Sequence, residues 1–102
     1  MQGNVRMRAR ISNNTILRRN PDQLYSVING EVVMLSISNG EYYSLDHVGS
    51  HIWYLLEEPC TFKKLINDLL ETYDVSESTC INDTKPFIIE FLNKGLIEIT
   101  IE

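Results

Sequence analysis

Apolar and polar residues alternate with a period of two in the first half of the chain and follow a helical period in most of the second half. The alternating segments predict three strands, at residues 24–28, 31–37 and 41–44. Asn29-Gly30 and Asn39-Gly40 separate them, and Asn-Gly is the pair that best tolerates the positive φ angles of a two-residue type I′ turn. We therefore expect a β-meander whose last strand, short and rich in Tyr and Ser, lies at the edge of a small sheet.

The middle strand of this meander is apolar on both faces. Val33, Leu35 and Ile37 make one face wholly apolar, whereas the residues between them make the other face only partly so. This pattern favours a strand that is covered on both sides.

Two helices are expected directly after the meander. Asp46 is a good N-cap for the first, and Pro59 ends it. Thr61 caps the second, whose apolar stripe over residues 62–73 is the clearest helical period in the chain.

A third helix begins at Ser76 or Ser78 and contains a proline. Pro86 removes one backbone donor inside this helix, at a cost of roughly 3 kcal/mol. Either the helix kinks near Asn82, or a separate helix starts with Asp83 as its N-cap and carries the proline in its first turn. The apolar stripe consists of Cys80, Thr84, Phe87, Ile88 and Phe91.

The chain ends in a further strand pattern. Ile97, Ile99 and Ile101 alternate with polar residues, and we expect this strand to pair with the sheet, against the segment around residues 15–17. The sequence thus predicts an α+β domain in which a three-stranded antiparallel sheet is followed by three helices and an extra C-terminal strand, with a winged helix-turn-helix-like topology.

Charge divides the 102 residues into an arm and a body. Residues 1–20 hold five Arg and no acid, whereas residues 21–102 hold four Lys and all fourteen acids. We expect residues 1–10 to be a flexible basic N-terminal arm and residues 11–102 to form a single domain. The acidic body repels a phosphate backbone, which argues against nucleic acid as its ligand.

The sequence carries no strong catalytic motif. It has no Gly-rich phosphate loop, no nucleophile elbow and no metal-ligand cluster, and His47 and His51, at helical spacing, lack a third ligand. Cys60 and Cys80 are best interpreted as reduced thiols. With no apolar stretch long enough for a signal peptide or a membrane span, we expect a cytoplasmic protein that is not an enzyme and needs no cofactor.

Tyr42 and Tyr43 draw attention to the edge strand. Adjacent residues on a strand point to opposite faces, so one of these rings faces away from the core. An edge strand offers unpaired N–H and C=O groups that can accept an extended peptide as a further strand. The residues alone therefore favour a peptide-binding edge.

The order and spacing of these segments resemble the PqqD-like proteins, the recognition elements for ribosomally made and modified precursor peptides. The resemblance runs from Gly30 to Ile97 and is most similar to the stand-alone members of lasso-peptide pathways. It is carried by GEVVMLSISNGEYYSLDHVGSHIWYLL, by TFKKLINDLLETYDV, and by Asp83 followed by FIIEFLNKGLIEI.

The resemblance implies a binding module that adds the leader of a precursor peptide antiparallel to the third strand, in a groove walled by the third helix. The implied partners are a leader-removing cysteine protease and an ATP-dependent cyclase, with no membrane involved. By position, the implied peptide-binding residues are Glu41, Tyr42, Tyr43 and Ser44 on the strand, and Asp83, Thr84, Phe87 and Ile88 on the helix.

A winged-helix DNA-binding regulator is the alternative, because it shares the order of elements and the arm is rich in Arg. The last helix, however, has Lys85 and Lys94 beside Asp83 and Glu90, and no Arg. Its Phe- and Ile-rich surface suits an apolar ligand better than a phosphate backbone. We further expect a leader or protease of basic character, bound more weakly at high salt.

Overall fold

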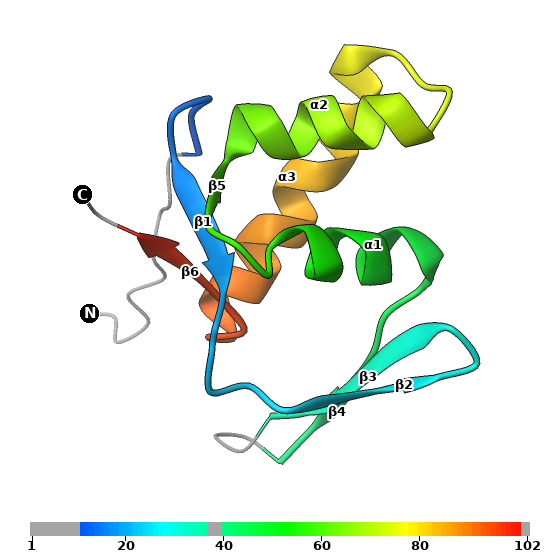
Figure 1. The fold of residues 1–102 in the computed structure, drawn as a ribbon. Coiled ribbons are helices and arrows are strands. Elements are labelled where there is room, and N and C mark those ends of the chain that lie inside the picture. Colours follow the sequence, from blue (N-terminus) through cyan, green and yellow to red (C-terminus); the bar gives the residue numbers. More distant parts are fainter. Residues whose placement is uncertain (1–10, 37–39, 101–102) are drawn as a thin grey trace.

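The computed structural model describes residues 11–36 and 40–100 (Figure 1). The expected arm at residues 1–10, the Ile37–Asn39 segment and Ile101 lie outside the described residues. The elements are β1 (Ile16–Arg19), β2 (Tyr25–Ile28), β3 (Glu31–Leu35), β4 (Tyr42–Ser44), α1 (His47–Leu55), β5 (Cys60–Thr61), α2 (Phe62–Thr72), α3 (Glu77–Asn93) and β6 (Ile97–Thr100). This order confirms the α+β prediction of a three-stranded sheet, three helices and a C-terminal strand.

The meander forms an antiparallel sheet in the order β2-β3-β4. Its first turn is confirmed, because Asn29 and Gly30 have φ angles of 53° and 83° and Ile28 pairs with Glu31. The second predicted turn, Asn39-Gly40, includes residues outside the described part of the chain. On either side of that part, the N–H of Ser36 donates to the carbonyl of Glu41 at 2.8 Å.

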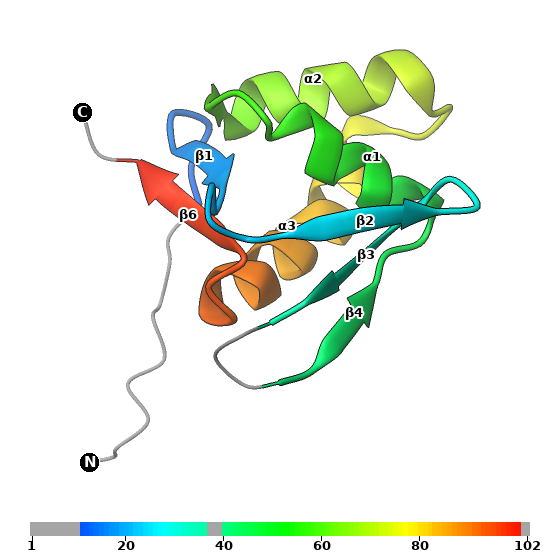
Figure 2. The same ribbon diagram turned by 60° about the horizontal axis from the view of Figure 1, so that its bottom comes forward.

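One face of the meander packs on the helices and the other is open. Val32, Met34 and Ser36 are buried, whereas Leu35 is 41% exposed. The prediction of cover on both faces is therefore wrong for the described residues: α1 and α3 lie on the same side of the sheet (Figures 1 and 2). Ser50 fixes α1 to this inner side, because its hydroxyl accepts from the N–H of Val32 at 2.9 Å.

A second sheet has the order β5-β1-β6. The predicted pairing of the C-terminal strand with the segment near residue 16 is confirmed, since Ile16 lies opposite Thr100 and Leu17 opposite Ile99. This strand does not join the meander. The two-residue strand β5 pairs with the other side of β1 and was not predicted.

The helix starts follow the predicted caps. The Asp46 carboxylate accepts from the N–H of Gly49 at 2.8 Å, and the hydroxyls of Thr61 and Ser76 accept from backbone N–H groups three residues on, at 3.1 and 3.2 Å. Each cap satisfies a donor that the first helical turn leaves unpaired.

α3 runs without interruption through Pro86. The predicted alternative of a separate helix starting at Asp83 is wrong, and Asp83 therefore caps no helix. The stripe of α3 is buried on both sides of the proline, at Cys80 and Thr84 before it and at Ile88 and Phe91 after it. Packing along the whole stripe therefore outweighs the lost backbone donor.

The core lies between the helices and the two sheets. Its largest fully buried side chains are Trp53, Phe62, Leu17, Met34, Leu56, Leu65, Leu69, Ile88, Leu96 and Ile97. α2 packs on α3, and α3 packs on β6. None of the described helices is long and apolar enough to cross a membrane.

Candidate functional site

β4 is the outer strand of the meander, and no described strand pairs with its far side. In an antiparallel ladder, residues alternate between pairs that exchange backbone hydrogen bonds and pairs that do not. Ser36 with Glu41 and Val32 with Leu45 are bonded pairs, with N···O distances of 2.8 and 2.9 Å. The intervening residues Tyr42 and Ser44 therefore direct their N–H and C=O groups outward, where they can pair with an added strand.

The two tyrosines point to opposite faces, as predicted. Tyr42 is 75% exposed on the open face, whereas Tyr43 is half-buried and lies against α3. The Tyr43 ring centroid is 6.4 Å from that of Phe91, and the Tyr43 hydroxyl donates to the carboxylate of Glu41 at 2.9 Å. Tyr43 thus links the edge strand to the helix that faces it.

Phe87 is the half-buried aromatic residue at the middle of this helix. Its ring stacks on Phe91 with centroids 4.3 Å apart. A Cβ atom at Gly49 would lie 3.2 Å from both the Phe87 ring and the Asp46 carboxylate, which is closer than such contacts normally come. Glycine at position 49 therefore lets the start of α1 approach Phe87 and holds the ring beside the end of β4.

Lys94 is the C-cap residue of α3. Its ammonium lies 4.6 Å from the Tyr43 ring centroid and donates to Glu90 at 2.7 Å. That hydrogen bond raises the pKa of Lys94, and the negative charge of Glu90 adds to the effect. The Lys94 ammonium is thus paired with the Glu90 carboxylate and lies over the Tyr43 ring.

The four helical residues predicted to contact a peptide do not share one face. Asp83 is exposed and Phe87 half-buried, but Thr84 is buried and Ile88 is fully buried in the core. Ile88 has no surface to offer a ligand, so the sequence-based assignment is corrected there. Thr84 and Asp83 line a pocket of about 160 Å³ that also contains Val48, Leu69, Tyr73, Val75 and Cys80.

The other candidate groups form no reactive cluster. His51 Nδ1 lies 3.2 Å from the Tyr73 hydroxyl, and no group of metal ligands occurs among residues 11–36 and 40–100. Burial raises the pKa of the Cys60 thiol, which lowers its nucleophilic thiolate fraction, and Cys80 is buried.

Comparison with known proteins connects this site to a family. The family model described as coenzyme PQQ synthesis protein D (PqqD) matches residues 31–97. The chain belongs to the PqqD family. The resemblance expected from the sequence is thereby confirmed. No curated protein sequence matches this PqqD-family chain.

A solved structure is also similar to this PqqD-family chain. It is TbiB1 in complex with the TbiA(beta) leader peptide, with a TM-score of 0.73 and 32% sequence identity. The alignment covers 83% of this chain and 99% of TbiB1. The PqqD match begins at β3 and includes β4, α1, α2 and α3, so every residue discussed at the edge lies inside it.

Sequence reasoning missed Lys94 as part of this site, and it missed Phe91 as the buried ring that lies against Tyr43 and Phe87. Phe91 belongs to the same apolar stripe as the core residues of α3, and periodicity alone cannot separate the two neighbours of a helix. Lys94 stands opposite Tyr43 only because β4 crosses this end of α3. A cation near the end of a helix ordinarily indicates only a favourable dipole interaction.

Proposed function

We propose that this protein binds the leader segment of a ribosomally made precursor peptide as a strand added antiparallel to β4. We place it in a lasso-peptide pathway, where it delivers the leader to a cysteine protease and an ATP-dependent cyclase and performs no chemical step itself. The observation that carries the proposal is the similarity, at 32% identity over 83% of the chain, to a protein in complex with a leader peptide.

The edge of β4 supports this proposal through its backbone geometry. Tyr42 and Ser44 offer two N–H and two C=O groups outward, each worth about 0.5–1.5 kcal/mol net when paired. A leader loses roughly 1–2 kcal/mol of conformational entropy for each residue that becomes fixed. Backbone pairing by itself therefore leaves little net affinity, and apolar contacts must supply the rest.

Side chains on α3 and β4 can supply those contacts. Phe87 and Tyr43 are half-buried aromatic rings on the inner side of the edge. Burying about 200 Å² of apolar surface against them would contribute about 5 kcal/mol. Alternate leader residues would point toward this side, so we expect two or three apolar anchors spaced by two in the leader.

Charge supports a leader with some basic residues. Glu41, Asp46 and Asp83 are exposed near the edge, and Lys94 is already paired with Glu90. Attraction between exposed charges is screened by salt, so the dissociation constant should rise between low and high ionic strength. An affinity that does not change with salt would contradict this part of the proposal.

The test is a titration of a fluorescently labelled leader peptide with the full-length protein, followed by anisotropy. A random DNA duplex serves as the control for the alternative of a winged-helix regulator. We expect saturable binding of the leader and none of the duplex. Binding of the duplex without the leader would overturn the proposal and direct attention to the Arg-rich segment at residues 1–20.

A further inference from the structure

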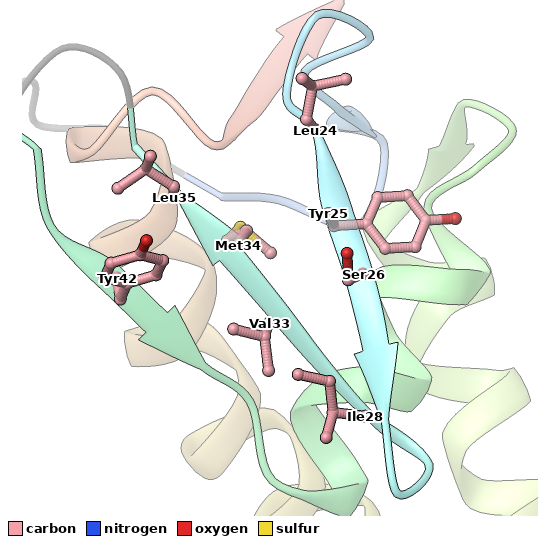
Figure 3. A pocket seen from close by; sticks show the side chains of 8 residues that line it. All are labelled: Leu24, Tyr25, Ser26, Ile28, Val33, Met34, Leu35 and Tyr42. Atoms are coloured by element: carbon pink, nitrogen blue, oxygen red, sulfur yellow. The ribbon is translucent and has the colours of Figure 1, made fainter.

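β6 is the outer strand of the second sheet (Figure 1), and no described strand pairs with its far side. It differs from the meander in what it leaves uncovered. The meander exposes apolar side chains on one face, as Figure 3 shows for Leu24, Ile28 and Tyr42. On β6, Ile97 is buried and Ile99 half-buried, so the uncovered part of this strand is its backbone.

The backbone groups of Ile97 and Ile99 point away from β1. The Asn20 N–H donates to the Leu96 carbonyl at 2.8 Å and continues the β1-β6 register, so these two residues form a hydrogen-bonded pair. Alternation along the ladder then leaves the pairs at Ile97 and Ile99 without mutual hydrogen bonds. The N–H of Arg19, opposite Ile97, agrees with this, because it donates to the carbonyl of the α1 C-cap residue at 3.1 Å. β6 therefore offers two N–H and two C=O groups to an added strand.

The side chains on the solvent side of β6 favour an occupant that brings hydrogen-bond donors. The Thr100 hydroxyl is buried and has no hydrogen-bond partner among the described residues. Arg18 Nε and Nη2 lie 3.1 and 3.0 Å from the same oxygen of Glu98, Oε1, so its Oε2 can still accept. Leaving a buried hydroxyl unpaired is costly, and a carboxylate binds a guanidinium well.

The sequence before β1 has the pattern of a strand that suits this edge. Apolar residues and arginines alternate there with a period of two, as in a strand with one covered face. The apolar positions are Val5, Met7, Ala9 and Ile11, and the positions between them are Arg6, Arg8 and Arg10. Ile11, which the structure describes, is 7% exposed and belongs to the core. The apolar side of this segment is thus anchored at its last residue.

A turn directs this segment toward β6. The Thr15 N–H donates to the Ser12 carbonyl at 3.1 Å, and the Ser12 N–H donates to the Thr15 hydroxyl at 2.9 Å. Because this β-turn reverses the chain directly before β1, a strand that precedes it would run antiparallel to β1 and parallel to β6. The other side of β1 is occupied, since the Thr15 carbonyl accepts from the Phe62 N–H at 2.8 Å. The far side of β6 is two strand spacings, about 10 Å, from β1, a distance that residues 11–16 can span.

We propose that residues 5–11 form a strand that pairs with the outer edge of β6. The apolar side chains of this segment then continue the covered face of Ile97 and Ile99, and its arginines lie beside Glu98 on the opposite face. Two β6 edges of different copies would instead bring their Glu98 side chains to one face, which is unfavourable.

The added strand protects an isoleucine-rich edge from pairing with other chains. It also engages the arginines with acids, which argues against their use in binding nucleic acid. The proposal replaces the expected flexible arm at residues 1–10 and does not depend on leader binding.

The test is amide hydrogen exchange, followed by NMR, on the full-length protein and on a variant that lacks residues 1–10. We expect the Ile97 and Ile99 N–H groups to exchange about tenfold faster or more in the shortened variant, because they lose their acceptors. The N–H of Glu98 is the internal control, since it points toward β1, and its exchange should change less than about twofold. Equal exchange of Ile97 and Ile99 in both proteins would overturn the inference.

Met7→Asp tests the pairing without shortening the chain, because it places a charge on the apolar side of the segment. Gln2→Asp is the matched control, since it adds the same charge outside the alternating residues. We expect Met7→Asp to raise the exchange of Ile97 and Ile99 about fivefold or more and Gln2→Asp to leave it unchanged. Identical exchange in these two variants would overturn the inference, even if removal of residues 1–10 destabilised the whole domain.

Sedimentation of the full-length protein at several concentrations identifies the occupant of the edge. Protection of Ile97 and Ile99 in a monomer would support pairing within one chain. Protection that appears only as a dimer forms would assign the edge to a second copy and would contradict the proposal. Leader binding enters none of these measurements, so their outcome and that of the leader titration are independent.

Discussion

The two sheets of this domain are built from equally short strands but differ in how they are packed. In the β5-β1-β6 sheet, β1 has a neighbour on each side, Leu17 is fully buried and Ile97 is 2% exposed. In the meander, every residue of β2 is exposed, and β4 has no described partner on its outer side. Both sheets contribute to one core, but the central strand β1 is paired on both sides, whereas β4 is open on its outer side in the described part of the chain.

This difference in strand pairing means that β1 contributes mainly to stability, whereas β4 keeps backbone groups available for a ligand. The strand β1 gains free energy from the buried contacts of Leu17, and its neighbours β5 and β6 occupy the backbone groups on both of its sides. An open edge keeps such groups available and is a liability for aggregation unless it is short or charged. β4 is three residues long and follows Glu41, which limits that liability while it keeps Tyr42 and Ser44 accessible.

The largest expected effect is on stability and tests the β5-β1-β6 sheet. Leu17→Ala should lower the free energy of unfolding by about 2–5 kcal/mol, because it leaves a cavity in a fully buried site. Leu24→Ala, on the exposed face of the meander, should change it by no more than about 0.5 kcal/mol. Urea denaturation of both variants measures the difference, and equal losses would mean that Leu24 is packed as tightly as Leu17.

The next effect is on leader binding through α3. Phe87→Asp should reduce leader affinity by about thirtyfold or more, because it places a charge where we propose that an apolar leader residue packs. The variant should still melt cooperatively, since Phe87 is only half-buried. Anisotropy titration and circular dichroism measure the two effects. Phe87→Ala should weaken binding in the same direction, and wild-type affinity in both variants would remove α3 from the site.

A smaller effect tests the direction of the backbone groups on β4. Ser44→Pro removes an N–H that points outward, so it should weaken leader binding about tenfold and leave the β3-β4 ladder intact. Tyr43→Pro is the matched control, because the Tyr43 N–H points toward β3 and its loss should lower the stability instead. If the two variants had the same effects, the inferred alternation of outward and inward backbone N–H groups along β4 would be wrong.

The local elements of this comparison were predictable, because local chemistry determines them. Asn29-Gly30 specified the first turn, and Asp46 and Thr61 specified the starts of α1 and α2. For α3 the sequence offered Ser76 or Ser78, and Ser76 is the cap. The two-residue strand β5 has no pattern of its own and exists only because β1 lies beside it.

The site was less predictable than the fold, since it depends on which side of an apolar element is covered. Ile88 and Phe87 are neighbours in one stripe of α3, yet the first is in the core and the second is at the surface. Both faces of β3 were expected to be covered, but only the face that contains Val32, Met34 and Ser36 is buried. Long-range packing decides such choices, and a single-sequence period does not encode it.

The smallest effect concerns the one cation that touches the edge strand from α3. Lys94→Met removes the 2.7 Å ion pair with Glu90 and the ammonium over the Tyr43 ring, so at pH 7 we expect a loss of stability below about 1 kcal/mol. Lys64→Met is the matched control, because the Lys64–Asp68 pair has the same 2.7 Å distance and i,i+4 spacing, and Lys64 contacts no ring among the described residues. We expect it to lose less.

The pH dependence of this last pair of variants has a definite sign. The hydrogen bond to Glu90 raises the pKa of Lys94 above its ordinary value of 10.5, so the folded state binds this proton more tightly than the unfolded state. Its contribution is fully present below that value and is lost as the pH rises through the higher folded pKa. The stability difference between wild type and Lys94→Met should therefore be constant from about pH 7 to 9 and shrink at more alkaline pH. A difference that grows with pH in urea titrations would mean that Lys94 is not held by Glu90, and that the edge strand meets α3 through Tyr43 and Phe91 alone.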